Sequence, residues 1–216
     1  MKIFDLSQPT YNACPAWPTY KLTSITYETV VGNEGYTSER IDFNSHTGTH
    51  LDAPFHFFPG KAAIDEIPLD RFIGRAHIVN LDGIAPRTGI DKARLDPYLT
   101  RIHSDDIVLI NTGWHKKRAF STEYYHDWPY LTGDGAEALL SRKIKGVGID
   151  GMSLGGWYEG TGRPCHEILL SNDIWILEEI CFPEELLAYE TCNLSAVPLR
   201  LKGFGGSPTR AYATVD

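Results

Sequence analysis

The stretch His46-Thr-Gly-Thr-His50-Leu-Asp52-Ala-Pro-Phe-His56 places three imidazoles and one carboxylate in a single short run. Both groups are common metal ligands and proton carriers. Gly48 and Pro54 disfavour a continuous helix, because glycine loosens the backbone and proline lacks the N–H that a helix interior needs. The sequence therefore predicts extended or turning backbone here, and we expect the chemistry of the protein in this run.

The spacing of these residues favours a catalytic metal site. On a strand, His50 and Asp52 share one face. With His46 they offer two imidazole nitrogens and a carboxylate oxygen, which suit zinc, manganese or iron, and three protein ligands leave a coordination position open. The alternative is that these are surface-loop histidines or hydrogen-bonded core histidines. The grouping of several of the chain's eight histidines around an aspartate favours the metal site.

Length and composition indicate one ordinary globular domain covering residues 1–216. The chain is 42% hydrophobic and 22% charged, which is typical of a folded domain of this size. The formal net charge is -8 and there is no long basic run. We therefore expect neither a nucleic-acid partner nor an anionic membrane surface, and small molecules are the expected partners.

Cysteine usage and the N-terminus indicate a cytoplasmic location. The four cysteines are scattered without a C-x-x-C pair, and the chain does not start with a charged-then-apolar signal segment. No stretch approaches the roughly eighteen apolar residues that a membrane span requires.

Hydrophobic periodicity predicts strands that alternate with helices. Runs of β-branched and aromatic residues predict strands, and stretches with capping residues predict helices. The predicted strands are 2–6, 22–31, 38–44, 77–81, 106–111, 145–150, 173–180, 195–202 and 209–215, and the predicted helices are 88–98, 134–145 and 183–189. Thr132 is the expected N-cap of the second helix and Gly146 its expected stop. The pattern indicates a single mixed α/β domain.

A second pair of candidate ligands, His166 and Glu178, lies far from the first run along the chain. Glu178 follows the apolar residues 174–177, where an inward-pointing carboxylate is costly unless a cation compensates its charge. A neighbouring metal ion is one such cation. The alternative is that Glu178 and Glu179 mark the solvated end of a strand, and periodicity alone favours neither interpretation.

The first run resembles the H-x-G-T-H-x-D-x-P-x-H signature of the metal-dependent cyclase family, which includes bacterial kynurenine formamidases and isatin hydrolases. It matches at every fixed position. Further matches in family order lie at residues 4–6, 111–114, 148–150 and 198–211, so the resemblance covers most of the chain. It implies the swivelling β/β/α arrangement of that family. We also expect a homo-oligomer, either a dimer or a tetramer.

The resemblance implies roles for the candidate ligands. His46, His50 and Asp52 would hold one metal ion, and Asp52 would bridge to a second ion held by His166 and Glu178. Zinc is the expected metal and manganese the alternative. Some relatives work with a single ion, so the resemblance implies one or two.

His56 has no obvious place among these ligands. It follows Pro54, which can turn the chain back toward the metal. A neutral imidazole with a pKa near the working pH suits proton transfer, and the resemblance implies that His56 is the general acid–base. The alternative role is that of a further metal ligand.

Aromatic residues near these segments favour a planar substrate. Trp17 lies in a Pro-x-Trp-Pro stretch that resembles one in formamidases of the family, and Phe57 and Trp157 are close to candidate ligands in sequence. We expect a metal-dependent amidohydrolase most like an arylformamidase, which converts N-formylkynurenine to kynurenine and formate in tryptophan catabolism. The alternative is ring opening of isatin or a related lactam or lactone, because residues 153–155 and the glycine-rich segment 156–163 depart from relatives.

Two other functions compete with this one. Gly151-Met-Ser-Leu-Gly155 fits the G-x-S-x-G nucleophile elbow, but a second glycine follows instead of a helix, and the last histidine of the chain is His166. A non-catalytic metal-binding protein would have saturated ligands and no spare proton carrier. His56 and the open coordination position argue for catalysis.

Overall fold

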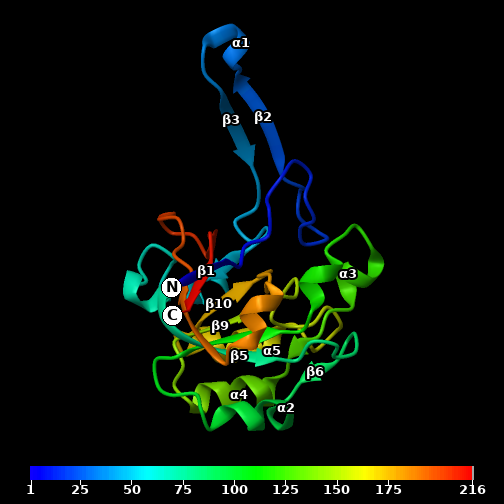
Figure 1. Cartoon of the computed structure of the whole chain (residues 1–216), viewed down its shortest axis with the longest axis vertical. Helices are drawn as coiled ribbons and strands as arrows, with labels where there is room; N and C mark the ends of the chain where they lie inside the picture. The colour runs from blue at the N-terminus through cyan, green and yellow to red at the C-terminus, as the bar shows by residue number, and fades with distance from the viewer. Residues whose placement is uncertain (216) are drawn as a thin grey trace.

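Nine strands form one mixed sheet in the computed structural model, which describes residues 1–215 (Figure 1). Their order across the sheet is β1-β13-β11-β5-β7-β9-β10-β4-β12. The bounds are β1 (Lys2–Asp5), β4 (His50–Asp52), β5 (Ile73–Asn80), β7 (Ile107–Asn111), β9 (Gly146–Ile149), β10 (Trp175–Glu178), β11 (Thr191–Ser195), β12 (Gly206–Pro208) and β13 (Tyr212–Val215). The central strands β5, β7, β9 and β10 are parallel, and the strands outside them pair antiparallel.

A long hairpin extends away from the body of the molecule (Figure 1). It consists of β2 (Ser24–Thr29) and β3 (Ser38–Asp42), with the short helix α1 (Val31–Glu34) at its tip. A second small sheet pairs β6 (Gly89–Ile90) with β8 (Tyr130–Leu131). The hairpin projects from the body, so most of its side chains are exposed to solvent.

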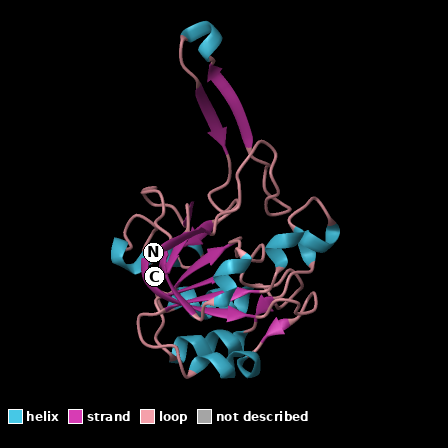
Figure 2. Cartoon of the chain, viewed as in Figure 1, coloured by secondary structure: helices cyan, strands magenta, loops and turns pink. Residues whose placement is uncertain are grey.

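The helices that cover the sheet lie together on one side of it, as Figure 2 shows for α2 and α4. The remaining α-helices are α2 (Lys92–Leu99), α3 (Thr122–His126), α4 (Gly133–Ser141) and α5 (Arg163–Ser171). Short 3-10 helices are η1 (Pro54–His56), η2 (Leu69–Phe72), η3 (Trp114–Lys117) and η4 (Glu184–Ala188). None of the helices in residues 1–215 has the length and apolar character needed to cross a membrane.

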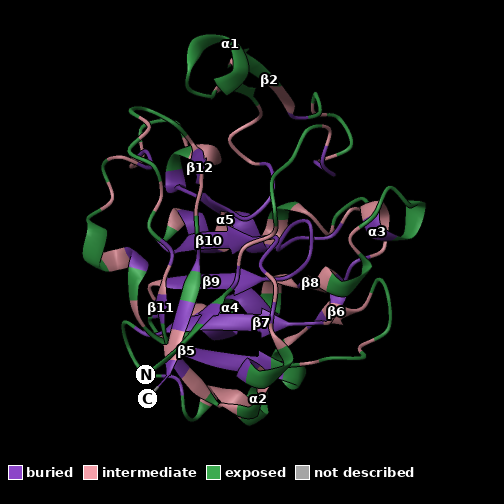
Figure 3. Ribbon diagram, turned by 45° about the horizontal axis from the view of Figure 1, so that its top comes forward, coloured by how far each residue is buried: buried purple, intermediate pink, exposed green. Residues whose placement is uncertain are grey.

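The hydrophobic core has three parts: two lie one on each face of the central strands, which are buried in Figure 3, and a smaller third part gathers Trp114, Tyr124, Trp128 and Met152. Along β7, Ile107 and Leu109 enter the first part, where strands β1, β11 and β13 pack. Val108 and Ile110 enter the second part, which α2, α4 and α5 cover. Parallel strands buried on both faces have continuous apolar sequences. The mixed α/β prediction and the β/β/α layering are confirmed.

Most predicted strands fall on observed ones, with differences at their ends. Thr132 caps α4 as predicted, because its side chain accepts a hydrogen bond from the N–H of Gly135. The stop at Gly146 is wrong: the helix ends at Ser141. The prediction of a strand over 195–202 is also wrong beyond Ser195. The observed strand is β11, which pairs with β5 and ends at Ser195.

Two further helix predictions need correction, and three α-helices, α1, α3 and α5, were not predicted. The helix expected over 88–98 begins at Lys92, because residues 89 and 90 pair with β8 and Asp91 provides the cap. The helix expected over 183–189 is the 3-10 helix η4. Sequence reasoning did not predict α5, although Pro164 in its first turn is a helix-start signal.

Candidate active site

Strands β4 and β10 place three of the candidate ligands on one face of the sheet. The two strands are antiparallel, and Glu178 lies opposite His50. Opposed residues project from the same face, and alternate residues of a strand share a face. His50, Asp52 and Glu178 therefore point the same way, while Leu51 and Leu177 pack in the first core on the other face. Burial of the leucines sets this register, because a shift by one residue would exchange them with the ligands.

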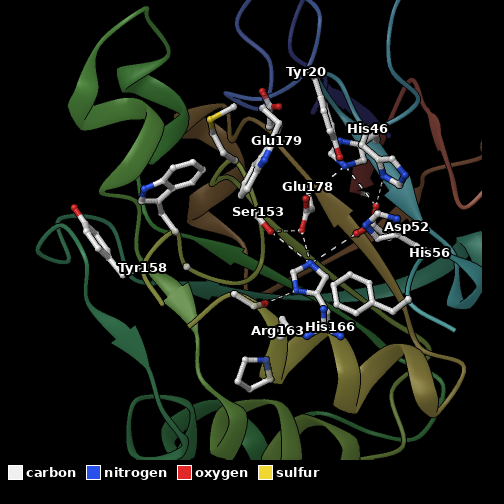
Figure 4. Close-up of a pocket in the computed structure, with 18 of the residues that line it drawn as sticks. Tyr20, His46, Asp52, His56, Ser153, Tyr158, Arg163, His166, Glu178 and Glu179 are labelled. Carbon is white, nitrogen blue, oxygen red and sulfur yellow. Dashed lines mark hydrogen bonds and ion pairs between the residues drawn. The ribbon is translucent and has the colours of Figure 1, made fainter. Parts of the chain in front are cut away.

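Helix α5 brings His166 to the same place, although the residue is distant in sequence (Figure 4). Its Nε2 lies 3.1 Å from Oε1 of Glu178 and 3.8 Å from Oδ2 of Asp52. Both glutamates at the end of β10 are buried, Glu178 at 4% exposure and Glu179 at 2%. The alternative of a solvated strand end is therefore wrong.

Two backbone carbonyls orient the imidazoles of His50 and His166. Nδ1 of His50 donates to the carbonyl of Gly48 at 2.7 Å, and Nδ1 of His166 donates to that of Gly162 at 2.8 Å. Each Nε2 then faces the carboxylates, as is typical of metal-binding histidines. Gly48 has a φ of 67°, a left-handed conformation that explains why glycine stands within the motif.

The carboxylate of Asp52 lies between the imidazoles. Its Oδ1 is 2.8 Å from Nδ1 of His46 and 3.5 Å from Nε2 of His50, and its Oδ2 faces His166. Contacts on both oxygens suit a carboxylate that bridges two ligand sets. By distance, Asp52 belongs to two groups whose ligand atoms lie within 4.8 Å of one another: His46, Asp52 and His56, and His50, Asp52 and Glu178.

This grouping differs from the division that the resemblance implied. Glu178 is grouped with His50 rather than with His166, although Nε2 of His166 also faces it. His56 lies beside His46, with ring centroids 4.1 Å apart. Its alternative role as a ligand therefore has geometric support.

Gly206 of β12 and Gly205, which precedes the strand, allow His46 and His56 to approach closely. A Cβ added to Gly206 would lie 2.4 Å from Cε1 of His46, and one on Gly205 would lie 3.0 Å from Cα of His56. Any larger side chain would displace these histidines. Sequence reasoning did not single out these residues; the Gly-Gly pair before Ser207 was the available signal.

The buried imidazoles and carboxylates of the site favour bound protons or a bound cation. Burial alone would lower the pKa of His50 and His166, but neighbouring groups outweigh this effect and raise both pKa values well above the ordinary value. For His50 these neighbours are Asp52 and Glu178. For His166 they are Cys165 and Glu178. Burial and Asp52 would raise the pKa of Glu178, yet the imidazoles lower it to about 2. Two buried carboxylates therefore stay ionised among groups that attract protons, and a divalent cation can replace those protons.

His56 has a different electrostatic environment. Burial is the main cause that lowers its pKa, and the nearby histidines add to the effect, while Asp52 and Glu178 oppose it. The ring is therefore neutral near neutral pH, as a proton acceptor must be.

A cavity of about 480 Å³ opens above these residues. Trp17, Phe57 and Trp157, the three predicted substrate contacts, all line it. The rings of Trp17 and Trp157 have centroids 5.3 Å apart, and Phe57 stacks on His166 with centroids 5.0 Å apart. The aromatic walls suit a flat ligand that reaches the histidines.

Among the cavity residues that sequence reasoning did not place in the site are Tyr20, Ser153, Arg163 and Glu179. The Ser153 hydroxyl donates to Oε1 of Glu178 at 3.0 Å, and the Leu154 N–H donates to the same oxygen at 2.7 Å. Ser153 lies 3.4 Å from Nε2 of His166. A serine triad is not formed, because Nδ1 of that histidine meets a backbone carbonyl instead of an acid, and α5 begins only at Arg163.

The donor set fits a first-row divalent ion. Imidazole nitrogens and carboxylate oxygens lie within 4.8 Å of one another. The protein also holds these side chains in place: Nδ1 of His50 and Nδ1 of His166 donate to backbone carbonyls, and Oε1 of Glu178 accepts from a backbone N–H. Without a cation, the buried carboxylates would have only protonated imidazoles to balance them.

Comparison with known proteins agrees with this chemistry. The family model described as "Putative cyclase" matches residues 4–155. Kynurenine formamidase of Bacillus anthracis is 28% identical over 97% of this chain and 96% of its own length. Kynurenine formamidase of Bacillus thuringiensis (strain Al Hakam) is 30% identical over 96% and 94%.

Solved structures give the same result. A predicted metal-dependent hydrolase from Bacillus stearothermophilus has a TM-score of 0.80 and 30% identity, covering 98% of this chain and 97% of that one. Isatin hydrolase A from Labrenzia aggregata, bound to benzyl benzoate, has a TM-score of 0.90 over 99% of this chain and 93% of that one, and at 23% identity it shows the shared fold. The prediction of a hydrolytic enzyme is confirmed, and the relatives together with the histidine–carboxylate groups indicate a divalent metal. The chain belongs to the cyclase family.

Proposed function

We propose that this protein is a metal-dependent arylformamidase that hydrolyses N-formylkynurenine to kynurenine and formate. The convergence of His50, Asp52, His166 and Glu178 under an aromatic-walled cavity is the observation that carries this proposal. The formamidase relatives, similar along almost the whole chain, support the choice of substrate.

These four residues and His46 would hold one or two ions, with zinc preferred for its affinity for imidazole and manganese as the alternative. When bound, such an ion supplies Lewis acidity, which polarises a carbonyl and lowers the pKa of water. Elemental analysis of protein purified without chelator identifies the metal and its stoichiometry.

The residues of the chain perform the rest of the reaction. His56, neutral near pH 7, takes a proton from the attacking water and returns it to the departing aniline nitrogen as the C–N bond breaks. Tyr20 lines the same cavity, and burial together with Asp52 and Glu178 raises its pKa. Its hydroxyl therefore stays protonated and can donate a hydrogen bond to substrate.

Arg163 favours a substrate that bears a carboxylate. It lines the cavity, its guanidinium lies 5.3 Å from the Phe57 ring centroid, and it donates twice to Oε1 of Glu167. The other charged lining residues besides the histidines are carboxylates. N-formylkynurenine carries a carboxylate beyond its aromatic ring, whereas isatin is neutral, so Arg163 distinguishes the two.

The test compares both substrates at equal metal loading. We expect a higher kcat/KM for N-formylkynurenine. Arg163→Gln should raise KM for this substrate by about tenfold, the scale of one charge-assisted hydrogen bond, and leave isatin hydrolysis unchanged; Arg163→Lys is the matched control. A higher kcat/KM for isatin in the wild type would assign the enzyme to the ring-opening branch. Activity confined to aliphatic esters or lactones would refute the aromatic-amide proposal.

We also propose that the protein is a homo-oligomer and that the projecting hairpin contacts a second copy. Tyr27, Val31, Tyr36 and Ile41 of the hairpin region are between 52% and 67% exposed. A lone two-stranded hairpin is only marginally stable in water, and grouped exposed apolar side chains mark interaction surfaces.

Light scattering after gel filtration tests this proposal. The wild type should have the mass of a dimer or tetramer, and Val31→Ser combined with Tyr36→Ser should yield smaller species. Leu199→Ser is the matched control, because Leu199 is also exposed but lies far from the hairpin in sequence. A monomeric wild type would refute the proposal. A cytoplasmic location stays a prediction.

A further inference from the structure

A second histidine–carboxylate cluster lies outside the cavity. His77 is on β5, Asp106 immediately precedes the neighbouring strand β7, and His103 is in the loop before it. None of these three residues lines the cavity of the candidate active site. One ligand atom from each lies within 4.8 Å of the others.

One carboxylate oxygen is the centre of this cluster. Oδ2 of Asp106 lies 2.8 Å from Nε2 of His77 and accepts a hydrogen bond from the backbone N–H of His103 at 2.8 Å. Nδ1 of His103 is 3.5 Å from the same oxygen. Asp106 and His77 are buried, at 6% and 5% exposure. A buried carboxylate thus meets two imidazoles that come from separate segments of the chain.

The exposure of His103 makes the cluster accessible. Its side chain is 64% exposed, so its ring can adjust to an ion without disturbing the core. Two guanidinium groups on neighbouring residues have other partners: Arg101 pairs with Glu190, and Arg142 donates to the carbonyl of Ile102. They therefore do not occupy the carboxylate of Asp106.

We propose that His77, His103 and Asp106 form an additional binding site for a divalent transition-metal ion of the zinc class. Two imidazole nitrogens and a carboxylate oxygen suit Zn²⁺ and leave a position for solvent. The ion links β5 to the loop that leads into β7, so its role is to stabilise the fold. This site is independent of the activity proposed above.

Zinc binding to the full-length protein tests the proposal. Chelator-treated protein is dialysed to equilibrium against Zn²⁺, and bound zinc and Tm are measured for the wild type and for His103→Ala. This substitution keeps the backbone N–H that contacts Asp106. We expect His103→Ala to bind one zinc ion fewer per chain and to lose part of the zinc-dependent rise in Tm. His126→Ala, which removes an imidazole elsewhere, is the matched control and should bind as much zinc as the wild type.

A second background separates this site from the cavity. The Asp52→Ala variant should still bind zinc at the second cluster. Adding His103→Ala to this variant should abolish that remaining zinc binding. Equal zinc content and equal Tm shifts in the wild type and His103→Ala would overturn the proposal, as would equal losses in His103→Ala and His126→Ala. Neither outcome bears on the proposed hydrolase, because activity is not the readout.

Discussion

The two histidine clusters of this molecule differ in the number of buried carboxylates that they contain. In the cavity, Asp52 and Glu178 are both buried and face at least three imidazoles. On β5, a single buried carboxylate, Asp106, meets one buried and one exposed imidazole. One divalent cation would match the two carboxylate charges of the first cluster, whereas at the second cluster its charge would exceed that of the single carboxylate. We therefore propose that the same side-chain types serve catalysis in one place and structure in the other.

The comparison predicts that Asp52→Ala has the largest effect. It removes the carboxylate that both ligand groups share and leaves Glu178 as the remaining carboxylate of these groups. We expect cavity metal to be lost and activity to fall by more than about ten-thousandfold, the upper range for loss of a general acid–base group. Elemental analysis and kcat/KM measure both. Full activity in metal-free protein would remove the basis for the metal site.

His56→Gln should affect chemistry more than metal content. We expect metal to be retained and kcat to fall by about a hundred- to ten-thousandfold, because only the proton carrier is lost. Asp106→Asn, in the other cluster, is the matched control and should leave kcat unchanged. If His56→Gln loses metal as completely as Asp52→Ala, His56 is a ligand, and the mechanism lacks its base.

The two clusters should also differ in their response to pH. The pKa of His50 and that of His166 are raised well above the ordinary value in the metal-free cavity, so protons compete with a metal ion into the neutral range. Metal affinity of the cavity should therefore rise with pH through neutrality and fall steeply in acid. Zinc titrations at several pH values, in the wild type and His103→Ala, measure this slope. A pH-independent affinity would contradict the assignment of these imidazoles as ligands.

Ser153→Ala should have the smallest effect of the series. The hydroxyl donates to the Glu178 carboxylate and orients it. Loss of such a supporting hydrogen bond typically lowers metal affinity by about ten- to a hundredfold, while kcat at saturating metal should change little. A loss of several orders of magnitude in kcat at full metal loading would instead indicate a serine nucleophile.

Much of the site was predictable from sequence because its central part is local. Gly48 and Pro54 restrict the backbone of the first run, and strand alternation then places His50 and Asp52 on one face. The apolar residues before Glu178 fitted either a buried carboxylate or a solvated strand end, and its 4% exposure shows that it is buried. Such signals depend on neighbouring residues only, so a linear pattern contains them.

Other features depend on contacts between distant segments, and only the tertiary structure decided them. The pairing of β4 with β10 places Glu178 opposite His50, and α5 brings His166 to Glu178 and Asp52. Periodicity cannot predict such pairings, because any buried strand could have been the neighbour. The close approach of Gly206 to His46 arises in the same way.

The sequence by itself determined the ligand types, the mixed α/β class and the family resemblance, because these follow from residue identity and short-range backbone preference. The tertiary structure alone decided which ligands share Asp52, that Arg163 lines the cavity, and that His77 meets Asp106 across neighbouring strands. The physical reason is that burial of apolar faces selects the strand order, and strand order then sets the distances between side chains far apart in the chain.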